Sequence, residues 1–304
     1  MYCSTESVAA KLTESHARLL TVRAKRIRPG ADDKALTAWN GLMLATVAEA
    51  ARVFDGEDKG NQYHTMATRS SEFLLTALRP DGRLCRSWRD GKVTEEVFLE
   101  DYAALILGLL ELYQTDFDNR WYATALELAD EMIERFNDPK GGFFDTPIDG
   151  ETLVLRPKDL QDNAIPSGNA LACEALLKLS AFSDNGHYRD LAERPLNLIG
   201  EGATRYPSAF ARWLSAADFA LGNVKQVAVL GETQDKNFQA LMQVIRNGYR
   251  PNVITATSVY PPAENAPLLL RNRPLLENKP TAYVCEGFVC RQPVNNPDEL
   301  QSQL

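Results

Sequence analysis

The chain has 304 residues, of which 44% are hydrophobic and 24% charged, so it can bury a core and form one large domain or two smaller ones. Its net charge of −8 argues against nucleic acid as a partner, because phosphate binding relies on clustered Lys and Arg. No stretch approaches the roughly 20 apolar residues of a membrane span, and nothing after Met1 resembles a signal peptide.

Polar residues precede an apolar helical pattern at three points along the chain: 32–43, 98–102 and 162–169. The period of about 65 residues is too long for the common single-pair solenoids and suits pairs of longer helices. The apolar spacing predicts three helix pairs and one further helix. The first pair is 37–54 with 66–78, the second is 101–113 with 122–136, and the third is 167–182 with 186–199. The further helix is 207–221. Ser167 is expected to be the N-cap of its helix.

Gly-bearing turns at 79–84 and 137–146 follow the first two pairs at equivalent positions. This arrangement predicts a mainly α chain in which helical hairpins form part of a toroid, from about residue 8 to 223 within a domain of residues 1–223.

Residues 224–304 differ from the helical part and predict a small α/β appendage. A short buried strand at 225–231, a helix at 236–248 and a second strand at 252–257 indicate a βαβ unit. After a Pro-rich loop, residues 282–291 supply one or two more strands.

The five cysteines are an odd, scattered set, which favours a reducing compartment and hence a cytoplasmic protein. Cys173 lies in an apolar run and is expected to be core. Cys285 and Cys290 would lie on opposite faces of a regular strand, so two separate thiols are the simpler expectation. A tight turn at 286–287 is the alternative, because it could join them in a disulfide or around a metal.

No other feature predicts a metal or a cofactor. The three histidines, His16, His64 and His187, lie in unrelated contexts and form no ligand pattern. We therefore expect neither metal catalysis nor a bound cofactor.

Five motifs resemble those of the YyaL-type thioredoxin-domain proteins, also called the spermatogenesis-associated protein 20 family. They are Asp-Asp-Lys-x-Leu-Thr-x-Trp-Asn-Gly-Leu-Met, Phe-Leu-Glu-Asp-Tyr-Ala, Gly-Gly-Phe-Phe-Asp-Thr, Pro-Ser-Gly-Asn and Ala-Tyr-Val-Cys-x-x-Phe-x-Cys, which begin at residues 32, 98, 141, 166 and 282. The resemblance covers nearly the whole chain from about residue 12 and implies an (α/α)6 toroid of the six-hairpin glycosidase type. No thioredoxin-like Cys-x-x-Cys segment and no first toroid hairpins precede Asp32. The chain therefore resembles only the C-terminal portion of the family.

In a helical toroid the turns that lead into the inner helices meet at one rim, where their side chains face a shared cavity. Glycoside chemistry needs two carboxylates, and sugar recognition needs an aromatic face with polar groups around it. The predicted catalytic acids are Asp101, Glu100 and Asp33. The predicted ligand-binding residues are Asp32, Trp39, Asn40, Tyr102, Lys158, Asp162, Ser167 and Asn169.

Helix capping is the competing explanation for each of these acids, because Asp, Ser and Asn are preferred at helix starts. The Gly and Trp choices around them are not required for capping. If Glu100 and Asp101 share a dry cavity, one should have a raised pKa or pair with a base such as Lys158 or Arg156.

Two functions from different classes remain open. The first is a carbohydrate-active domain, glycosidase-like or epimerase-like, that binds a small polar ligand such as a sugar. The absence of a rim histidine in the motifs counts against epimerisation more than against hydrolysis.

The second is a noncatalytic module that binds a ligand or a partner, which the resemblance implies would be a thioredoxin-like domain. A third reading is a fragment without independent function. An incomplete toroid would expose apolar faces such as Leu12, Leu19 and Leu20, so we also expect self-association.

Overall fold

The computed structural model describes residues 4–152 and 154–304, so Cys3 lies outside the described residues. Two compact units are formed, Met1–Lys34 and Ala35–Leu304. The boundary predicted after residue 223 falls inside the second unit, where helices give way to a sheet.

The first unit contains one helix, α1 (Thr5–Ala24), followed by an extended segment. The side chain of Ser4 caps the helix by accepting a hydrogen bond from the backbone N–H of Ser7. No residue of α1 is buried, and Leu12 and Leu19 are exposed as the sequence predicts. Among the described residues, no helix is both long enough and apolar enough to span a membrane.

The second unit joins a layer of helices to a small sheet. The helices are α2 (Thr37–Val53), α3 (Asp58–Ala77), α4 (Leu99–Asp116), α5 (Asn119–Phe136), α6 (Gly168–Ser183), α7 (Gly186–Arg205), α8 (Ala211–Leu221), α9 (Lys236–Arg246) and α10 (Pro297–Gln303), with short 3-10 turns at Pro207–Ala209 and Leu268–Leu270. The strands are β1 (Ala35–Leu36), β2 (Ser87–Arg89), β3 (Lys92–Thr94), β4 (Lys225–Leu230), β5 (Val253–Ser258), β6 (Thr281–Glu286) and β7 (Val289–Cys290).

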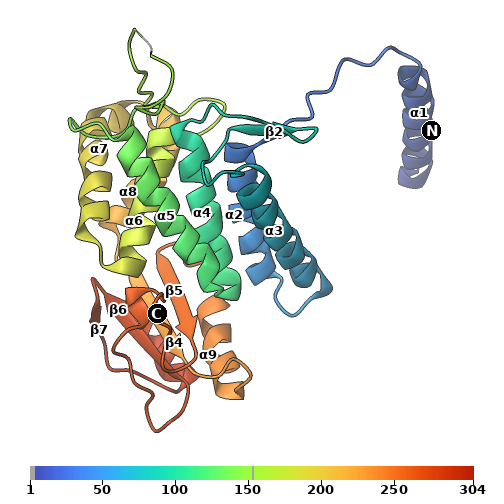
Figure 1. The fold of residues 1–304 in the computed structure, drawn as a ribbon. Helices are drawn as coiled ribbons and strands as arrows, with labels where there is room; N and C mark the ends of the chain where they lie inside the picture. The colour runs from blue at the N-terminus through green and yellow to red at the C-terminus, as the bar shows by residue number, and fades with distance from the viewer. Residues whose placement is uncertain (1–3, 153) are drawn as a thin grey trace. The chain divides into compact units, whose positions relative to one another are not determined.

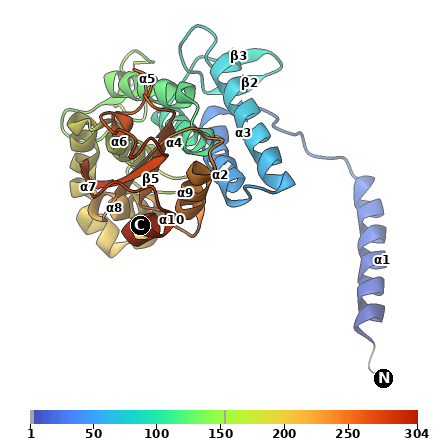
Figure 2. The same cartoon turned by 90° about the horizontal axis from the view of Figure 1, so that it is seen from below.

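The helices α2 to α7 form three consecutive hairpins, which confirms the predicted pairs. Each hairpin packs its first helix against the first helix of the next, so α2, α4, α6 and then α8 make an inner row. The partners α3, α5 and α7 lie outside that row. The inner helices follow one another along an arc (Figure 2), which is the partial (α/α) toroid that the sequence predicts.

The closest approach of two inner helices is at glycine residues. A Cβ on Gly41 would lie 2.6 Å from the carbonyl carbon of Ala104, and one on Gly108 would lie 2.7 Å from the backbone oxygen of Gly41. The two backbones of α2 and α4 therefore touch where neither residue has a side chain.

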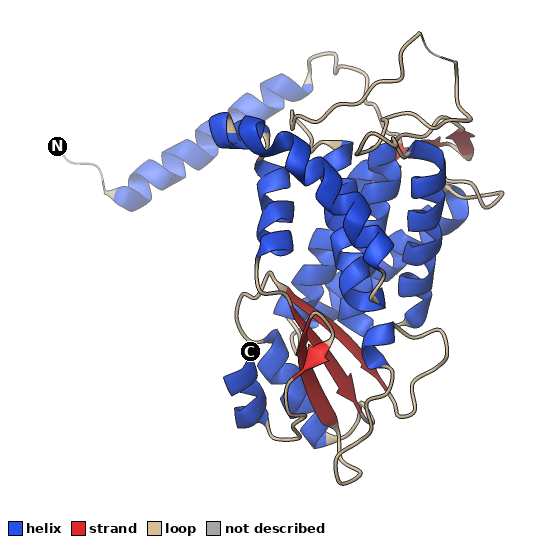
Figure 3. Ribbon diagram, turned by 90° about the vertical axis from the view of Figure 1, so that its left-hand side faces the viewer, coloured by secondary structure: helices blue, strands red, loops and turns tan. Residues whose placement is uncertain are grey.

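The two ends of the helical layer differ. The loops that lead into α4 and α6, together with the β1–β2–β3 sheet, gather at one end, and the four-stranded sheet lies at the other (Figures 1 and 3). We call the loop end the rim. The inner helices begin there, so their N-terminal groups meet at the rim.

The appendage confirms the predicted βαβ unit. Its sheet has the order β5-β4-β6-β7, with β4 parallel to β5 and antiparallel to β6. Alternate residues of β4 face different cores: Ala228 and Leu230 join the core of the helical layer, whereas Val227 and Val229 pack with α9 and α10.

The expectation of two separate thiols at Cys285 and Cys290 is wrong. A turn with Gly287 at φ 55° and Phe288 at φ 63° ends β6, so Cys290 on β7 pairs directly with Cys285 and a disulfide joins them. Cys173 is buried in the helical core, as predicted.

Candidate functional site

Asp101 is a buried cap that serves two helices. Its Oδ1 accepts a hydrogen bond from the backbone N–H of Ala38 in the first turn of α2, at 3.1 Å. Its Oδ2 accepts one from the backbone N–H of Phe98, which precedes α4, at 3.0 Å. Both carboxylate oxygens are thus occupied by helix starts, so Asp101 is a positioning residue.

Arg86 is the cation that pairs with both predicted acids, Glu100 and Asp101. Its Nη1 lies 2.9 Å from Glu100 Oε1 and 3.1 Å from Asp101 Oδ2. The expected partners are used elsewhere, because Lys158 pairs with Asp138 and Arg156 stacks on Phe144. Burial raises the pKa of Asp101 to about 6, although Arg86 acts in the opposite direction. One acid of the pair therefore has the raised pKa that the sequence predicts.

Asp162 repeats the same device between the next pair of inner helices. Its Oδ1 accepts from the backbone N–H of Ser167 at α6, and its Oδ2 accepts from that of Arg212 at α8, both at 2.8 Å. Ser167 occupies the N-cap position of α6, but its hydroxyl donates to the backbone oxygen of Asp159 instead of capping the helix. Asp162 supplies the cap that was expected of Ser167.

Asn169 holds the loop that follows α5. Its side-chain Oδ1 accepts from the Phe143 N–H at 2.7 Å, and its Nδ2 donates to the Phe143 carbonyl at 2.9 Å. Lys158 donates to Asp138 at 2.8 Å and to the carbonyl of Gly141. A Cβ on Gly142 would lie 2.9 Å from Asn169 Oδ1, so this loop depends on glycine.

Arg156 also serves the loop after α5. Its guanidinium stacks over the Phe144 ring, 4.1 Å from the ring centre, and donates to the carbonyl of Thr146. Lys158, Asn169 and Arg156 are thus used to shape the loop.

Asp145 is a rim acid that the sequence did not mark as a site residue. Its backbone oxygen accepts from the Leu99 N–H at 3.0 Å, and its Oδ2 accepts from the Asp159 N–H at 2.8 Å. Burial raises its pKa to about 6, and the nearby carboxylates of Asp159 and Glu100 act in the same direction. Asp145 therefore lies close enough to Glu100 for that carboxylate to help raise its pKa.

The two predicted aromatic platforms have different environments. Trp39 is 57% exposed in the first turn of α2, where Asn40 donates to the carbonyl of Leu36. Tyr102 is fully buried against Phe136, and its hydroxyl donates to Glu131. The prediction of Tyr102 as a stacking platform is corrected by its packing, because neither ring face reaches solvent.

Asp32 and Asp33 belong to the first unit, and the site described here is built from the second unit alone. Asp32 accepts from the Lys34 N–H at 3.5 Å and lies 3.4 Å from the Lys34 ammonium. The structure therefore brings together Glu100 and Asp101, and the role of Asp33 stays a prediction.

A cavity of about 1140 Å³ lies along the inner row and is lined by α2, α4, α6, α8 and the segment from α9 to β5. The helical repeat shows which rim residues lie on the same side of their helix as the residues that line the cavity. Trp39 lies on the side of α2 that presents Leu42 and Thr46 to the cavity, and Glu100 lies on the side of α4 that presents Leu107 and Glu111. Trp39 and Glu100 are thus at the rim ends of the cavity-facing sides of their helices.

Charged residues on the four inner helices cross this cavity as a network. Glu111 lies 2.5 Å from Arg52 and 2.8 Å from Lys178, and Lys178 lies 3.3 Å from Glu174, which is 2.6 Å from Arg212. Burial would raise the pKa of Glu111, but its ion pairs with Lys178 and Arg52 outweigh burial and lower it to about 2. The lining of the cavity therefore carries a chain of ion pairs beside its apolar side chains.

Chemically, the rim offers an exposed indole, an ion-paired carboxylate and a second carboxyl group that is partly protonated near pH 6. This set suits a polar ligand with apolar ring faces, such as a sugar. Among the described residues, no cluster of three or more metal-ligating side chains is present. The sequence missed Arg86 and Asp145 because both lie in loops whose folding back onto α4 leaves no periodic signal.

The chain is similar in sequence to part of a longer protein. No family model matches the chain. The human protein named spermatogenesis-associated protein 20 is 33% identical over 317 residues, which cover 98% of this chain and 39% of that protein. Its mouse counterpart is 31% identical over the same proportions. The chain therefore spans about two fifths of the length of the curated relatives it matches.

Two solved structures are similar to part of the chain. Cellobiose 2-epimerase from Spirochaeta thermophila is 17% identical with a TM-score of 0.45, over 55% of this chain and 43% of that chain. A GH76 α-mannanase from Bacteroides thetaiotaomicron is 14% identical with a TM-score of 0.41, over 57% of this chain and 45% of that chain.

Proposed function

Since the chain corresponds to 39% of the spermatogenesis-associated protein 20 sequence, we propose that it is a toroid domain that binds a small polar ligand, a carbohydrate, at the rim. One observation carries this proposal. The exposed Trp39 and the ion-paired Glu100 lie at the rim ends of two cavity-facing helix sides. An indole face attracts the apolar face of a sugar ring, and charged groups beside it bind the hydroxyls.

Glu100 and Asp145 are the groups that would act on a bound sugar. A glycosidic bond is broken when one carboxyl group protonates the leaving oxygen and a second carboxylate activates water or attacks the sugar. Asp145, whose pKa is raised to about 6, supplies the acid, and Glu100 supplies the carboxylate. Asp101 acts through the backbone by holding α2 and α4 in place.

A thermal-shift screen against monosaccharides, amino sugars and short oligosaccharides tests binding. A ligand at about 100 times its Kd should stabilise the protein by about 2.7 kcal/mol and raise the melting temperature by several degrees. Trp39→Ala should abolish this rise. Met43→Ala is the matched control, because Met43 is also exposed on α2, at 61%.

Turnover is tested separately with any ligand that shifts the melt. Glu100→Gln and Asp145→Asn should each lower the rate by at least about a hundredfold, whereas Glu134→Gln on the outer helix α5 should not. The rate should fall as pH rises above about 6, because Asp145 then loses its proton. If no sugar in the panel shifts the melt, the carbohydrate proposal is wrong.

A noncatalytic binding module is the second candidate, and the use of Asp101 as a double cap favours it. In that case a ligand shift would appear without turnover. The partner would then be a second copy of the chain or a thioredoxin-like domain. A cytoplasmic location belongs to the same proposal and is tested by cell fractionation.

A further inference from the structure

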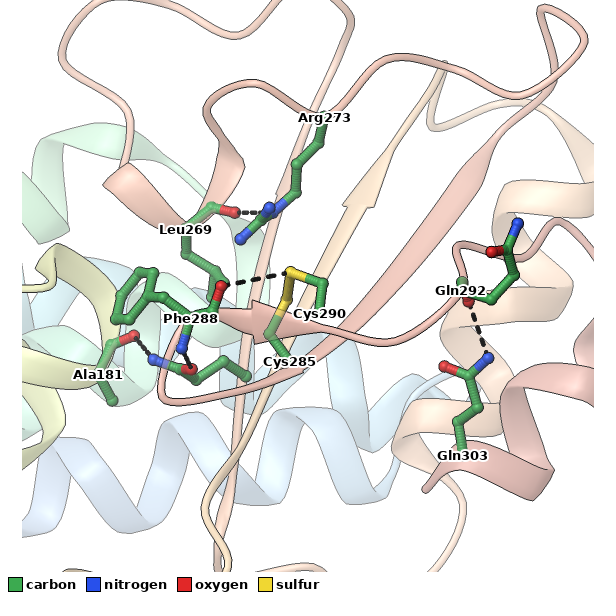
Figure 4. Close-up of a disulfide and its surroundings, with 9 residues drawn as sticks. Ala181, Leu269, Arg273, Cys285, Phe288, Cys290, Gln292 and Gln303 are labelled. Carbon is green, nitrogen blue, oxygen red and sulfur yellow. Dashed lines mark hydrogen bonds between the residues drawn. A yellow bond between two sulfur atoms is a disulfide. The ribbon is translucent and has the colours of Figure 1, made fainter.

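The described cysteines fall into two chemical classes. Cys85 and Cys173 are buried free thiols, and burial raises the pKa of each, which makes them poor nucleophiles. Cys285 and Cys290 are joined by a disulfide between β6 and the two-residue strand β7 (Figure 4). Oxidation is thus confined to one pair, while two further thiols remain reduced in the core.

The two sulfurs of the disulfide are unequally accessible. Cys285 is fully buried and faces the core of the helical layer, whereas Cys290 is only half-buried. An incoming thiolate therefore reaches Cys290 Sγ first. Attack on that sulfur leaves Cys285 as the departing group.

The turn closed by this disulfide is tied to the helical layer through Gln226. The backbone N–H of Phe288 donates to Gln226 Oε1 at 2.8 Å, and Gln226 Nε2 donates to the carbonyl of Ala181 in α6, also at 2.8 Å. Gln226 is buried, so its bond to Ala181 is shielded from water and its bond to Phe288 is partly shielded. Figure 4 shows Phe288 and Ala181 at the two ends of this relay.

The same turn forms one wall of a small cavity. Residues 286–288 line a space of about 230 Å³ together with the C-terminal ends of α6 and α8 and the start of α7. Because the disulfide closes only a short loop, it constrains the unfolded chain weakly and acts mainly on the local turn.

We propose that the Cys285–Cys290 disulfide is an exchange site for a protein dithiol, and that its reduction releases the β6–β7 turn from the helical layer. The attacking thiolate forms a mixed disulfide with Cys290 and expels Cys285 as a thiolate, which takes up a proton. The second thiolate of the partner then attacks the mixed disulfide, forms the partner's own disulfide and leaves Cys290 reduced. Two electrons pass from the dithiol to the pair, and both cysteines end as thiols.

Alkylation of the native protein tests the exchange, with dithiothreitol as the dithiol and glutathione as the monothiol, in a Cys3→Ser background. Untreated protein should carry no label at Cys285 or Cys290. After dithiothreitol both should be labelled, roughly tenfold more than Cys85 or Cys173. Glutathione should give less labelling, because no second thiol resolves the mixed disulfide.

Three results would overturn the proposal. Label on Cys285 or Cys290 before reduction would mean that the bond is absent in solution. Resistance to dithiothreitol in the native protein would mean that the bond is purely structural. Equal labelling of Cys85 and Cys173 would mean that reduction requires unfolding.

Amide hydrogen exchange measures whether reduction releases the β6–β7 turn from the helical layer. Reduction should speed amide exchange at Phe288, and Cys290→Ser should reproduce this effect without a reductant. Cys85→Ser is the matched control and should leave that amide unchanged. If Cys290→Ser does not fold, the dithiothreitol-treated wild-type chain gives the same readout, and an unchanged Phe288 amide would refute the release.

Discussion

Asp101 is the most constrained side chain of the rim, because its carboxylate joins two helix starts and an arginine. Asp101 stabilises the protein by accepting hydrogen bonds from the backbone N–H groups of Ala38 and Phe98, which have no partner within their own helices. The same carboxylate could not release those bonds during a reaction without loosening α2 and α4.

Asp101→Asn should therefore lower stability rather than remove a catalytic group. An amide can still accept from Ala38, but its NH2 cannot accept from Phe98, so a buried donor is left unpaired at a cost of about 2 kcal/mol. Urea unfolding measures this loss. Glu100→Gln is the control and should cost less than about 1 kcal/mol, since Glu100 and Arg86 are partly exposed. An unchanged midpoint for Asp101→Asn would contradict the capping role.

The raised pKa of Asp101 predicts a specific pH dependence. Its pKa is about 6 in the folded chain against 3.8 for the ordinary group, so the folded state binds more protons between these values. Stability should then fall as pH rises from about 4 to 6, by at most about 3 kcal/mol for this group, and level off above. Asp145 acts in the same direction. Urea midpoints measured across this range should flatten in Asp101→Asn, and an equal slope in both proteins would assign the effect elsewhere.

At the rim, the sequence predicts which residues gather but not what each one does. Polar residues at the helix starts are enough to bring Glu100, Asp162 and Asn169 to the rim. Their partners depend on loop paths, and this is why the sequence proposed Lys158 where Arg86 pairs with the acids. Tyr102 was misjudged because exposure depends on the outer helix α5, which covers it.

At the scale of elements, the contact between α2 and α4 is the tightest in the helical layer. Gly41 and Gly108 allow the two backbones to touch, and the resulting axis separation sets where both helix starts lie. The spacing of the rim groups thus depends on residues well inside the layer.

Gly41→Ala should destabilise the protein by at least about 2 kcal/mol, because the new Cβ would lie 2.6 Å from backbone atoms that cannot move alone. Gly200→Ala in α7 is the matched control. Nothing lies within 4 Å of its Cβ position, so removing a helical glycine there should stabilise by about 0.5 to 1 kcal/mol. Thermal melts of the two variants should move in opposite directions, and a shared direction would mean that helix propensity outweighs packing.

The elements that the sequence predicted well are those with many periods of apolar spacing. The three hairpins and the βαβ unit agree with their predictions, because each is long enough for packing and propensity to favour the same structure. Short elements such as α10 and β1 carry too few residues for a pattern. The disulfide was given only as the alternative, because a regular strand was the simpler expectation for residues 285–290, and positive φ values at Gly287 and Phe288 end that strand.

At the scale of the whole molecule, the helical row leaves an apolar side of α2 and α3 open. Met43, Val53 and Met66 are 61%, 69% and 55% exposed, which is unusual for residues of helices in a packed layer. Exposed apolar side chains favour contact with another protein surface, so we expect this side of α2 and α3 to mediate self-association.

Self-association of the purified chain should therefore be measurable by light scattering, and Met43→Glu with Val53→Glu should reduce it. Val289→Glu is the control, because Val289 is 78% exposed on β7 and lies away from these helices. A monodisperse monomer at high concentration would show that this surface has no affinity for itself.

The shared caps also bear on how such a chain acquires its shape during synthesis. Helix α2 has no side-chain cap of its own, and the carboxylate that caps it lies 63 residues further along the chain. During synthesis, the first turn of α2 would therefore stay uncapped until Asp101, at the start of the next hairpin, had left the ribosome. Asp162 imposes the reverse order on α8, whose cap is already made when that helix appears. The first hairpin would then be completed only when the second begins, whereas α8 would find its cap already in place.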